Sequence, residues 1–307
     1  MDELYDLIIV RGGPAGLTAG LYARRSELKT LLLEKMEVGG QILGTDVIEN
    51  YPGFQRTTGA ELTRLMKEHT LSYGLELKME GAALIYAEGA YKIAKTEENT
   101  YRAKTIIVAS GAEPKELGVP GEKEMRGRGV SYCAVCDAPL FKGKELIVAG
   151  GGDSAVQEGN YLSKFGRQVN IVHRRDKFRA QPILQERLLN NPKVKVIWDT
   201  VLEKIEGKGR VEQVWLKNVK TQETYSRKAD GVFIFVGMKP NSNIFKDPVE
   251  KDELGFVITK DNMETSIPGI FAVGDVRSRI QRQIVTAAGD GATGVYAAER
   301  YIDNWKA

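Results

Sequence analysis

Two cysteines three positions apart are the residues of this chain best suited to chemistry. Cys133 and Cys136 are the only thiols among 307 residues. Two cysteines cannot form a disulfide scaffold for a chain of this length, and a structural zinc ion needs about four ligands. The only histidines, His69 and His173, are far from the pair in the sequence. The spacing therefore favours a redox-active dithiol, with two buried structural thiols as the alternative.

The surroundings of the cysteines favour the redox reading. A Cys-x-x-Cys motif at the start of a helix has a lowered thiol pKa and closes a small, reducible disulfide. Asp137 follows Cys136 directly, where a carboxylate can exchange a proton with a leaving thiolate. An exposed aspartate in a first helical turn is the simpler explanation of Asp137. We take Cys133, Cys136 and Asp137 as the candidate catalytic residues.

An internal repeat organises the rest of the chain. An apolar run at residues 7–10 leads into a glycine-rich turn at 11–16, and a second run at 146–149 leads into another at 150–155, an offset of 139 residues. In both copies a helix-like stretch and a second apolar run follow. The second runs, at 30–33 and 169–172, keep the same offset. Each copy therefore predicts a βαβ unit with the same crossover length.

Two later strands indicate how the copies are connected. Apolar runs at 106–109 and 233–236 each lead into Gly-x-x-Pro, at 111–114 and 237–240, which is a turn signal. We therefore expect an α/β protein with two nested Rossmann-like dinucleotide-binding domains, the second inserted into the first. Residues 1–113 and 241–307 form the first domain, and residues 114–240 form the second, which carries the dithiol. The two crossings form a two-stranded hinge.

Composition excludes several classes of protein. The 44 basic and 41 acidic residues give a net charge of +3, without the clustered basic excess of a nucleic-acid binder. The longest apolar runs, such as 105–109 and 232–236, fall far short of the ~20 residues that a membrane span needs. The acidic start of the sequence does not resemble a secretory signal. We expect a cytoplasmic protein with neither a nucleic-acid nor a membrane partner.

The residues after each second strand distinguish the two dinucleotides. In a strand–turn–helix unit the glycines let the backbone approach a pyrophosphate at the helix N-terminus. In the first copy Glu34 directly follows the second apolar run, and a carboxylate at that position suits the hydroxyls of a ribose. The second copy has His173-Arg174-Arg175 and then Arg179, and guanidinium groups bind a 2′-phosphate bidentately. The second site is therefore expected to bind NADPH, although a solvated basic turn is the alternative.

The dithiol and NADPH together imply a third redox group. Both exchange two electrons, but NADPH delivers them as hydride, which does not pass efficiently to a disulfide without a mediator. A flavin accepts hydride on one face and passes electrons to sulfur from the other. The first dinucleotide is therefore expected to be FAD.

With these motifs assembled, the chain resembles the low-molecular-weight thioredoxin reductases over essentially its whole length. The motifs that carry the resemblance are Gly12-Gly13-Pro14-Ala15-Gly16, Gly39-Gly40-Gln41, Glu49-Asn50-Tyr51-Pro52-Gly53, Ala109-Ser110-Gly111, Gly127-Arg128-Gly129-Val130-Ser131, Cys133-Ala134-Val135-Cys136-Asp137, residues 150–155, His173-Arg174-Arg175-Asp176 with Arg179, Val273-Gly274-Asp275 and Arg282-Gln283-Ile284. The set is far more specific than any one of its members.

The resemblance implies roles for individual residues. Glu34 binds the adenosine ribose of FAD, Gln41 and Asn50 lie near the isoalloxazine, Asp275 lies by the ribityl–pyrophosphate segment, and Gln283 and Ile284 cover the pyrimidine edge. The expected FAD site comprises Gly12, Gly13, Ala15, Gly16, Glu34, Gly40, Gln41, Asn50, Gly111, Gly274, Asp275, Arg282, Gln283 and Ile284. The expected NADPH site comprises Gly150, Gly152, Asp153, Ser154, Ala155, His173, Arg174, Arg175 and Arg179. No metal site is expected.

The resemblance also implies an activity and an assembly. NADPH reduces FAD, FAD reduces the Cys133–Cys136 disulfide, and the dithiol reduces thioredoxin by thiol–disulfide exchange. A homodimer and a rotation between the two domains are implied as well. Three alternatives remain open at this point. These are reduction of another small thiol protein, an oxidase that passes electrons to oxygen, and a flavin-poor redox sensor or binding protein that keeps the fold.

The sequence departs from the family pattern at three places. Arg11 stands at the first glycine position of the first fingerprint, where a side chain crowds the turn and strains the backbone. We expect it to lower FAD affinity, unless its guanidinium offsets part of the loss at the pyrophosphate. Val135 and Ala138 stand where the family more often has Thr and Gly. Gln157 and Gly159 replace common Glu and Ala, and these changes leave the expected function intact.

Overall fold

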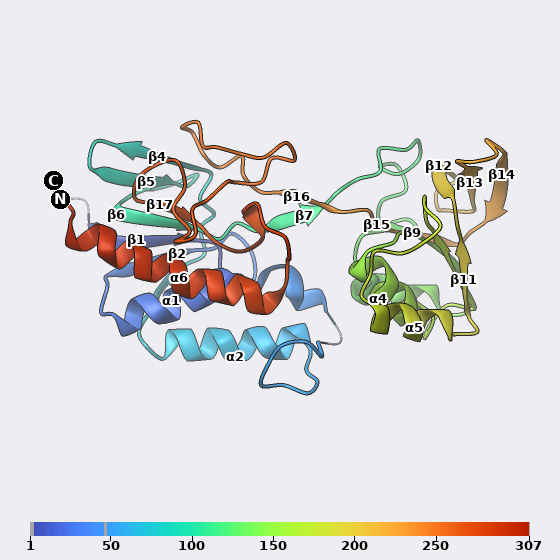
Figure 1. Cartoon of the computed structure of the whole chain (residues 1–307), viewed down its shortest axis with the longest axis horizontal. Helices are drawn as coiled ribbons and strands as arrows, with labels where there is room; N and C mark the ends of the chain where they lie inside the picture. The colour runs from blue at the N-terminus through green and yellow to red at the C-terminus, as the bar shows by residue number, and fades with distance from the viewer. Residues whose placement is uncertain (1–2, 46–47, 307) are drawn as a thin grey trace. The chain divides into compact units, whose positions relative to one another are not determined.

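The computed structural model describes residues 3–45 and 48–306 of the chain (Figure 1). The chain divides into two compact units. Unit 1 consists of Met1–Glu113 and Lys239–Ala307, and unit 2 of Pro114–Met238. Unit 2 is thus inserted into unit 1, and the chain passes between them twice.

Unit 1 is built on a mixed, mainly parallel seven-stranded sheet. Its strand order is β3-β2-β1-β6-β5-β4, with β17 also paired to β6. The strands are β1 (Leu4–Val10), β2 (Thr30–Leu33), β3 (Glu76–Lys78), β4 (Leu84–Glu88), β5 (Tyr91–Lys95), β6 (Thr100–Val108) and β17 (Ile270–Ala272). The helices are α1 (Pro14–Arg25), η1 (Gly40–Gly44), α2 (Gly59–Leu71), η3 (Gly274–Val276) and α6 (Ile284–Asp303).

Alternating residues of β1 explain why both faces of this sheet are covered. Leu7 and Ile9 pack with small residues of α1 and α6, whereas Ile8 and Val10 pack into a second cluster on the other face. Helices α1 and α6 approach closely because a glycine stands at their crossing. A Cβ at Gly291 would overlap the carbonyl oxygen of Ala15. The start of α1 is therefore held against α6 at the edge where the predicted cofactor residues lie.

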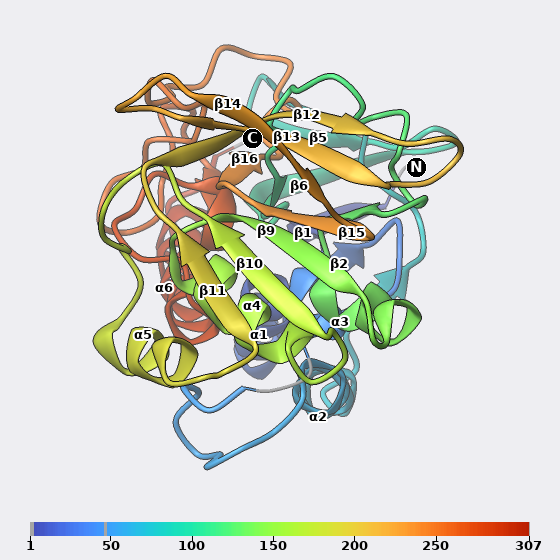
Figure 2. The same ribbon diagram turned by 90° about the vertical axis from the view of Figure 1, so that its right-hand side faces the viewer.

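Unit 2 contains a five-stranded parallel sheet and a separate antiparallel one (Figure 2). The parallel order is β11-β10-β9-β15-β8, and the antiparallel order is β12-β13-β14. The strands are β8 (Val130–Ser131), β9 (Glu145–Gly150), β10 (Gln168–Val172), β11 (Val194–Ile197), β12 (Thr200–Glu206), β13 (Gln213–Asn218), β14 (Thr224–Lys228) and β15 (Gly231–Phe235). The helices are α3 (Ala134–Asp137), η2 (Ala138–Phe141), α4 (Asp153–Leu162) and α5 (Pro182–Leu189).

The internal repeat is confirmed down to strand register. In unit 1, Leu7 of β1 pairs with Thr30 of β2. In unit 2, Leu146 of β9 pairs with Val169 of β10, and both pairs are parallel. The partners in the second copy lie 139 positions after those in the first. The predicted fold class, two nested Rossmann-like α/β domains, is therefore confirmed.

The two passages between the units form a short ladder. Strands β7 (Ala112–Pro114) and β16 (Met238–Pro240) pair with each other. On the side of unit 1 the Asn241 amide donates to the Gly111 carbonyl at 3.0 Å, and on the side of unit 2 the Lys115 amide donates to the Gly237 carbonyl at 2.9 Å.

None of the helices among the described residues is long and apolar enough to cross a membrane.

Candidate redox and dinucleotide-binding sites

The two cysteines form a disulfide at the surface of unit 2. Cys133 and Cys136 are bonded, with their Cα atoms 5.4 Å apart. Cys133 lies between β8 and α3, and the Cys136 amide donates to its Sγ at 3.2 Å. Because Cys136 is exposed, the alternative of two buried structural thiols is wrong. Asp137 follows at the end of α3 and is half-buried. In the described part of the chain, no three potential metal-ligating side chains cluster.

The two glycine-rich turns have the same geometry at the helix that follows. Gly13 precedes α1 and Gly152 precedes α4, both in extended conformation and without a side chain capping the helix. A Cβ placed on either glycine would meet nothing within 4 Å. Each turn therefore leaves free backbone N–H groups and open space, which is what a pyrophosphate requires. Gly16 has a different role, because a Cβ there would overlap the Arg11 carbonyl oxygen.

Glu34 is held in place by the backbone around the first turn. It follows β2 directly and is only 3% exposed. Its Oε2 accepts from the Gly12 amide at 2.7 Å, and its Oε1 accepts from the amides of Lys35 and Met36 at 2.7 and 3.0 Å. The carboxylate thus lies beside the first glycine-rich turn, and the family resemblance implies that the adenosine ribose binds Glu34.

Arg11 adds a fourth group to this carboxylate. Its Nη1 lies 2.8 Å from Glu34 Oε1, and its φ of +82° is in the left-handed region. That conformation favours glycine and costs a residue with a side chain roughly 1–2 kcal/mol. The strain expected from the sequence is therefore present. The guanidinium is paired with Glu34.

One other predicted FAD residue lies against this turn, and two more, from distant parts of the chain, contact each other. Gly40 begins η1, and a Cβ there would lie 3.3 Å from the Gly13 Cα. Gln41 is exposed in η1. The Asn50 side-chain amide donates to Gln283 Oε1 at 2.9 Å, although 233 residues separate the two. Ile284 begins α6 directly after Gln283.

Asp275 has the environment expected of a cofactor contact. Gly274, just before it, lies against Ala15 of α1, with 3.0 Å between a Cβ built on the glycine and the Ala15 Cβ. The Oδ1 of Asp275 is buried without a partner among the described residues. Burial raises the pKa of Asp275, against the effect of the nearby Arg279 and Arg282 guanidinium groups. A hydroxyl group of a ligand is the kind of donor that such an oxygen lacks.

A buried ion-pair network supports this turn and was missed by the sequence reasoning. Asp290 of α6 is 9% exposed. Its Oδ2 accepts from the Gly274 amide at 3.0 Å and from Arg279 at 2.8 Å, and its Oδ1 accepts from Arg277 at 3.0 Å. The signal in the sequence was an acidic residue between two glycines in an apolar helix. Arg282 lies over the Phe256 ring, 3.8 Å from its centroid.

The arginines predicted to bind NADPH lie in one exposed loop after β10. Arg174, Arg175 and Arg179 are all exposed. The Arg179 amide donates to the Gly151 carbonyl at 2.8 Å, which holds the loop against the second glycine-rich turn. The structure thus brings the backbone of the arginine loop and the second glycine-rich turn together within unit 2.

The side chains of His173 and Asp153 contact the backbone of this loop. His173 is buried beneath Gly151, where a Cβ would overlap its ring, and its Nε2 lies 3.0 Å from the Lys177 carbonyl oxygen. Burial lowers the pKa of His173. The Asp153 carboxylate accepts from the backbone and side-chain amides of Gln181 at 2.8 and 2.9 Å. Ser154 is exposed and Ala155 is buried in the first turn of α4. Both acid and imidazole therefore orient the loop, a role that spacing alone did not reveal.

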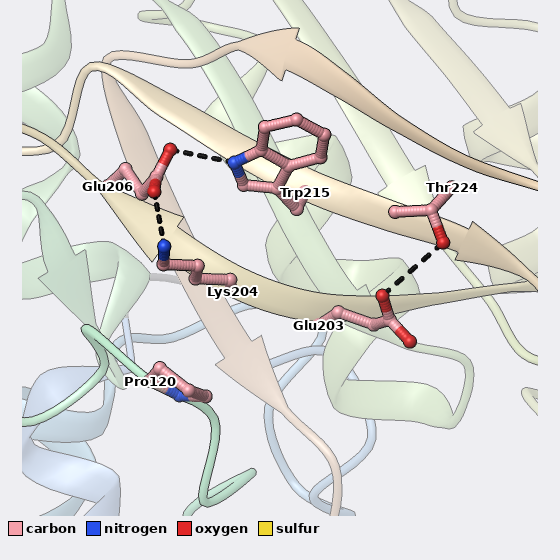
Figure 3. A pocket seen from close by; sticks show the side chains of 6 residues that line it. All are labelled: Pro120, Glu203, Lys204, Glu206, Trp215 and Thr224. Carbon is pink, nitrogen blue, oxygen red and sulfur yellow. Dashed lines mark hydrogen bonds and ion pairs between the residues drawn. The ribbon is translucent and has the colours of Figure 1, made fainter.

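A hollow of about 480 Å³ on the antiparallel sheet of unit 2 holds none of the predicted residues (Figure 3). Its carboxylates are already engaged. Glu206 accepts from Lys204 and from Trp215 Nε1, the latter at 2.7 Å, and these bonds lower the pKa of Glu206 to about 2. Glu203 accepts from Thr224 at 3.5 Å. Both carboxylates that line the hollow therefore already have partners among its other lining residues.

Comparison with known proteins agrees with this arrangement. Residues 5–291 match the family described as pyridine nucleotide-disulphide oxidoreductase. A curated thioredoxin reductase of Bacillus subtilis is 48% identical over 303 residues, which cover 98% of this chain and 96% of the relative. Two solved structures also match. Thioredoxin reductase of Lactococcus lactis has a TM-score of 0.96 at 47% identity, covering 98% of this chain and 99% of the other. That of T. acidophilum has a TM-score of 0.93 at 33% identity, covering 99% and 100%.

The likeness extends over both units and includes the parts on which the chemistry depends. An accessible disulfide, two matched glycine-rich turns and an arginine loop occur in one chain whose relatives cover it almost completely. The chain belongs to the pyridine nucleotide-disulphide oxidoreductases and, among them, to the low-molecular-weight thioredoxin reductases.

Proposed function

We propose that this protein is an NADPH-dependent thioredoxin-disulfide reductase that uses FAD. The observation that carries the proposal is the exposed Cys133–Cys136 disulfide in a chain with two dinucleotide turns of matching geometry. Unit 1 is the FAD-binding domain and unit 2 is the NADPH-binding domain. The alternative of a flavin-poor sensor finds less support, because the residues around Gly13 fit a flavin dinucleotide.

The fit to FAD rests on this chain's own groups. Glu34 offers carboxylate oxygens beside the Gly12–Gly13 turn. Asp275 offers a buried, unsatisfied acceptor directly after Gly274, which packs against Ala15. The Asn50–Gln283 pair gives amide groups for a heterocycle at the start of α6. Bound FAD supplies two-electron acceptance from hydride and electron donation to sulfur.

The dithiol connects this chemistry to a protein substrate. Two electrons and two protons convert the Cys133–Cys136 disulfide into two thiols. One of these attacks the thioredoxin disulfide as a thiolate, giving a mixed disulfide, and the second thiol resolves it. The original disulfide reforms and thioredoxin leaves with two thiols. NADPH, one proton and oxidised thioredoxin are thus converted into NADP⁺ and reduced thioredoxin. We propose that Asp137, which directly follows Cys136, moves the proton.

The surface near the cysteines suits a protein partner. Arg128 and Leu140 are both exposed and flank the dithiol in the sequence, and Leu140 is 76% exposed. A basic and an apolar group on either side of an accessible disulfide favour docking of a small thiol protein such as thioredoxin. We further propose a homodimer located in the cytoplasm, in line with the family resemblance.

Rapid mixing of the oxidised holoprotein with NADPH tests the function as a whole. We expect NADPH to bleach the flavin absorbance, NADH to do so much more slowly at equal concentration, and thioredoxin to restore it through turnover. Oxygen consumption at the full rate without thioredoxin would favour an oxidase instead. A purified protein without flavin colour that stays colourless after incubation with FAD would contradict the proposal.

Replacing Arg11 with Gly is expected to strengthen FAD binding several-fold. Glycine adopts a φ of +82° without strain, and Glu34 keeps its three backbone N–H donors while its carboxylate is freed from the guanidinium. The measurement is the dissociation constant from quenching of FAD fluorescence. Arg11→Ala is the matched control, since it removes the guanidinium but keeps the strained backbone. If the Gly variant instead releases FAD faster, Arg11 is an FAD ligand.

A further inference from the structure

We propose that Tyr132 and Glu122 are a positioning pair that fixes Cys133 relative to Cys136 and so sets the stability of the catalytic disulfide. The inference rests on the proposed function of this disulfide as the redox centre. Neither residue belongs to the motifs that identified the sites, and neither bonds to a sulfur atom. Both lie in unit 2, and Tyr132 directly precedes Cys133.

Glu122 is a buried carboxylate with a complete set of donors. It is 1% exposed. Its Oε1 accepts from the Leu117 amide at 2.9 Å and from the Tyr132 hydroxyl at 2.6 Å. Its Oε2 accepts from the amides of Gly118 and Val119 at 2.6 and 3.2 Å. A carboxyl group buried in this way holds its partners firmly, because each lost hydrogen bond leaves a costly unsatisfied group.

Tyr132 connects Glu122 to Cys133, because its hydroxyl binds Glu122 and its backbone is bonded to Cys133. Its ring packs against the apolar cluster under the antiparallel sheet, and the Arg126 guanidinium lies 5.0 Å from the ring centroid. The ring and the hydroxyl are therefore fixed separately. Burial and the hydrogen bond to Glu122 raise the pKa of Tyr132, so its hydroxyl stays a donor throughout the physiological range.

The backbone on either side of Tyr132 leaves little freedom to Cys133. The Ser131 hydroxyl accepts from the Cys133 amide and donates to the Cys133 carbonyl, both at 3.1 Å. Ser131 itself belongs to β8, which pairs with β15 in the parallel sheet. Ser131 thus connects Cys133 to the parallel sheet. Tyr132, which directly precedes Cys133, connects it to Glu122. The two thiols, once reduced, stay close together.

Orientation of this kind favours the disulfide. Two thiols that are fixed near each other have a high effective concentration, which shifts the exchange with glutathione toward the disulfide. In that exchange the protein disulfide and two glutathione thiols give the protein dithiol and one glutathione disulfide. Loosening Cys133 lowers the effective concentration and moves the equilibrium toward the dithiol. A residue needed only for folding would leave this equilibrium unchanged.

The test compares full-length holoproteins equilibrated in glutathione buffers of graded composition. The fraction of dithiol is counted by alkylation and mass measurement. We expect Tyr132→Phe and Glu122→Gln each to shift the equilibrium constant toward the dithiol by about threefold or more. Tyr225→Phe is the matched control, because Tyr225 packs against the same apolar cluster from β14, and we expect it to behave as wild type.

The double variant separates a shared network from two independent effects. If the residues act as a pair, Tyr132→Phe with Glu122→Gln shifts the equilibrium no more than the larger single change. Wild-type equilibrium constants in both single variants, or full additivity in the double variant, would overturn the proposal. The assay needs neither NADPH nor thioredoxin, so its failure is distinct from failure of the proposed activity.

Discussion

Replacement of either Cys133 or Cys136 with Ser is expected to reduce NADPH-dependent thioredoxin reduction to the background rate. Each variant keeps one sulfur, which can neither form the internal disulfide nor resolve a mixed disulfide with thioredoxin. No other thiol in the chain can substitute, because these are its only two cysteines. The measurement is NADPH oxidation with thioredoxin as the acceptor, and the effect is the largest that any single substitution should have.

Flavin reduction in the same variants is the internal control. NADPH reaches the flavin before the disulfide takes part, so bleaching of the flavin by NADPH should keep a rate close to that of wild type. Loss of both steps would indicate a folding or cofactor defect. Sustained turnover with thioredoxin in both single variants would show that electrons leave the protein by another route.

Replacement of Arg174 and Arg175 together with Ala is expected to raise the KM for NADPH by about 100-fold. A hydrogen bond to a charged group contributes about 1.5–3 kcal/mol, and about 1.4 kcal/mol corresponds to a factor of ten. Both side chains are exposed, so solvent screening places the effect at the low end of that range. The KM for NADH should change little, because NADH lacks the 2′-phosphate.

Arg167→Ala is the matched control for this change. Arg167 is an exposed arginine of the same unit, but it pairs with Glu145 at 2.9 Å and lies outside the loop after β10. We expect both cofactors to keep their wild-type KM in this variant. If the ratio of kcat/KM for NADPH to that for NADH stays unchanged in the double variant, the loop is only a solvated basic turn. That result would contradict the NADPH site.

The fold was accessible from the sequence because its signals are local and repeated. Short apolar runs leading into glycine-rich turns predicted two βαβ units, and the pairs Leu7–Thr30 and Leu146–Val169 confirm the common offset. Glycine is required at such turns by steric overlap with near neighbours, as at Gly16. The family resemblance, which used the order of these motifs, is confirmed by the relatives.

The accessibility of the cysteines and the contacts of charged side chains were decided only by the tertiary structure. Spacing suggested a dithiol, but the exposed Cys136 is what excludes a buried structural pair. Asp153 and His173 stand at expected cofactor positions, yet one binds Gln181 and the other lies under Gly151. A side chain of this length reaches several neighbours, and the nearest one is set by how the loops pack.

The residues by themselves determined which strands, turns and redox groups the protein contains, since these depend on neighbours a few positions away. Tertiary structure decided which distant groups meet. Asn50 contacts Gln283 across 233 positions, and Asp290 supports the turn at Gly274 from another helix. Arg11 likewise finds Glu34 only because β1 and β2 are adjacent. Long-range contacts of this kind have no period or spacing along the chain, because packing of separate elements against one another creates them.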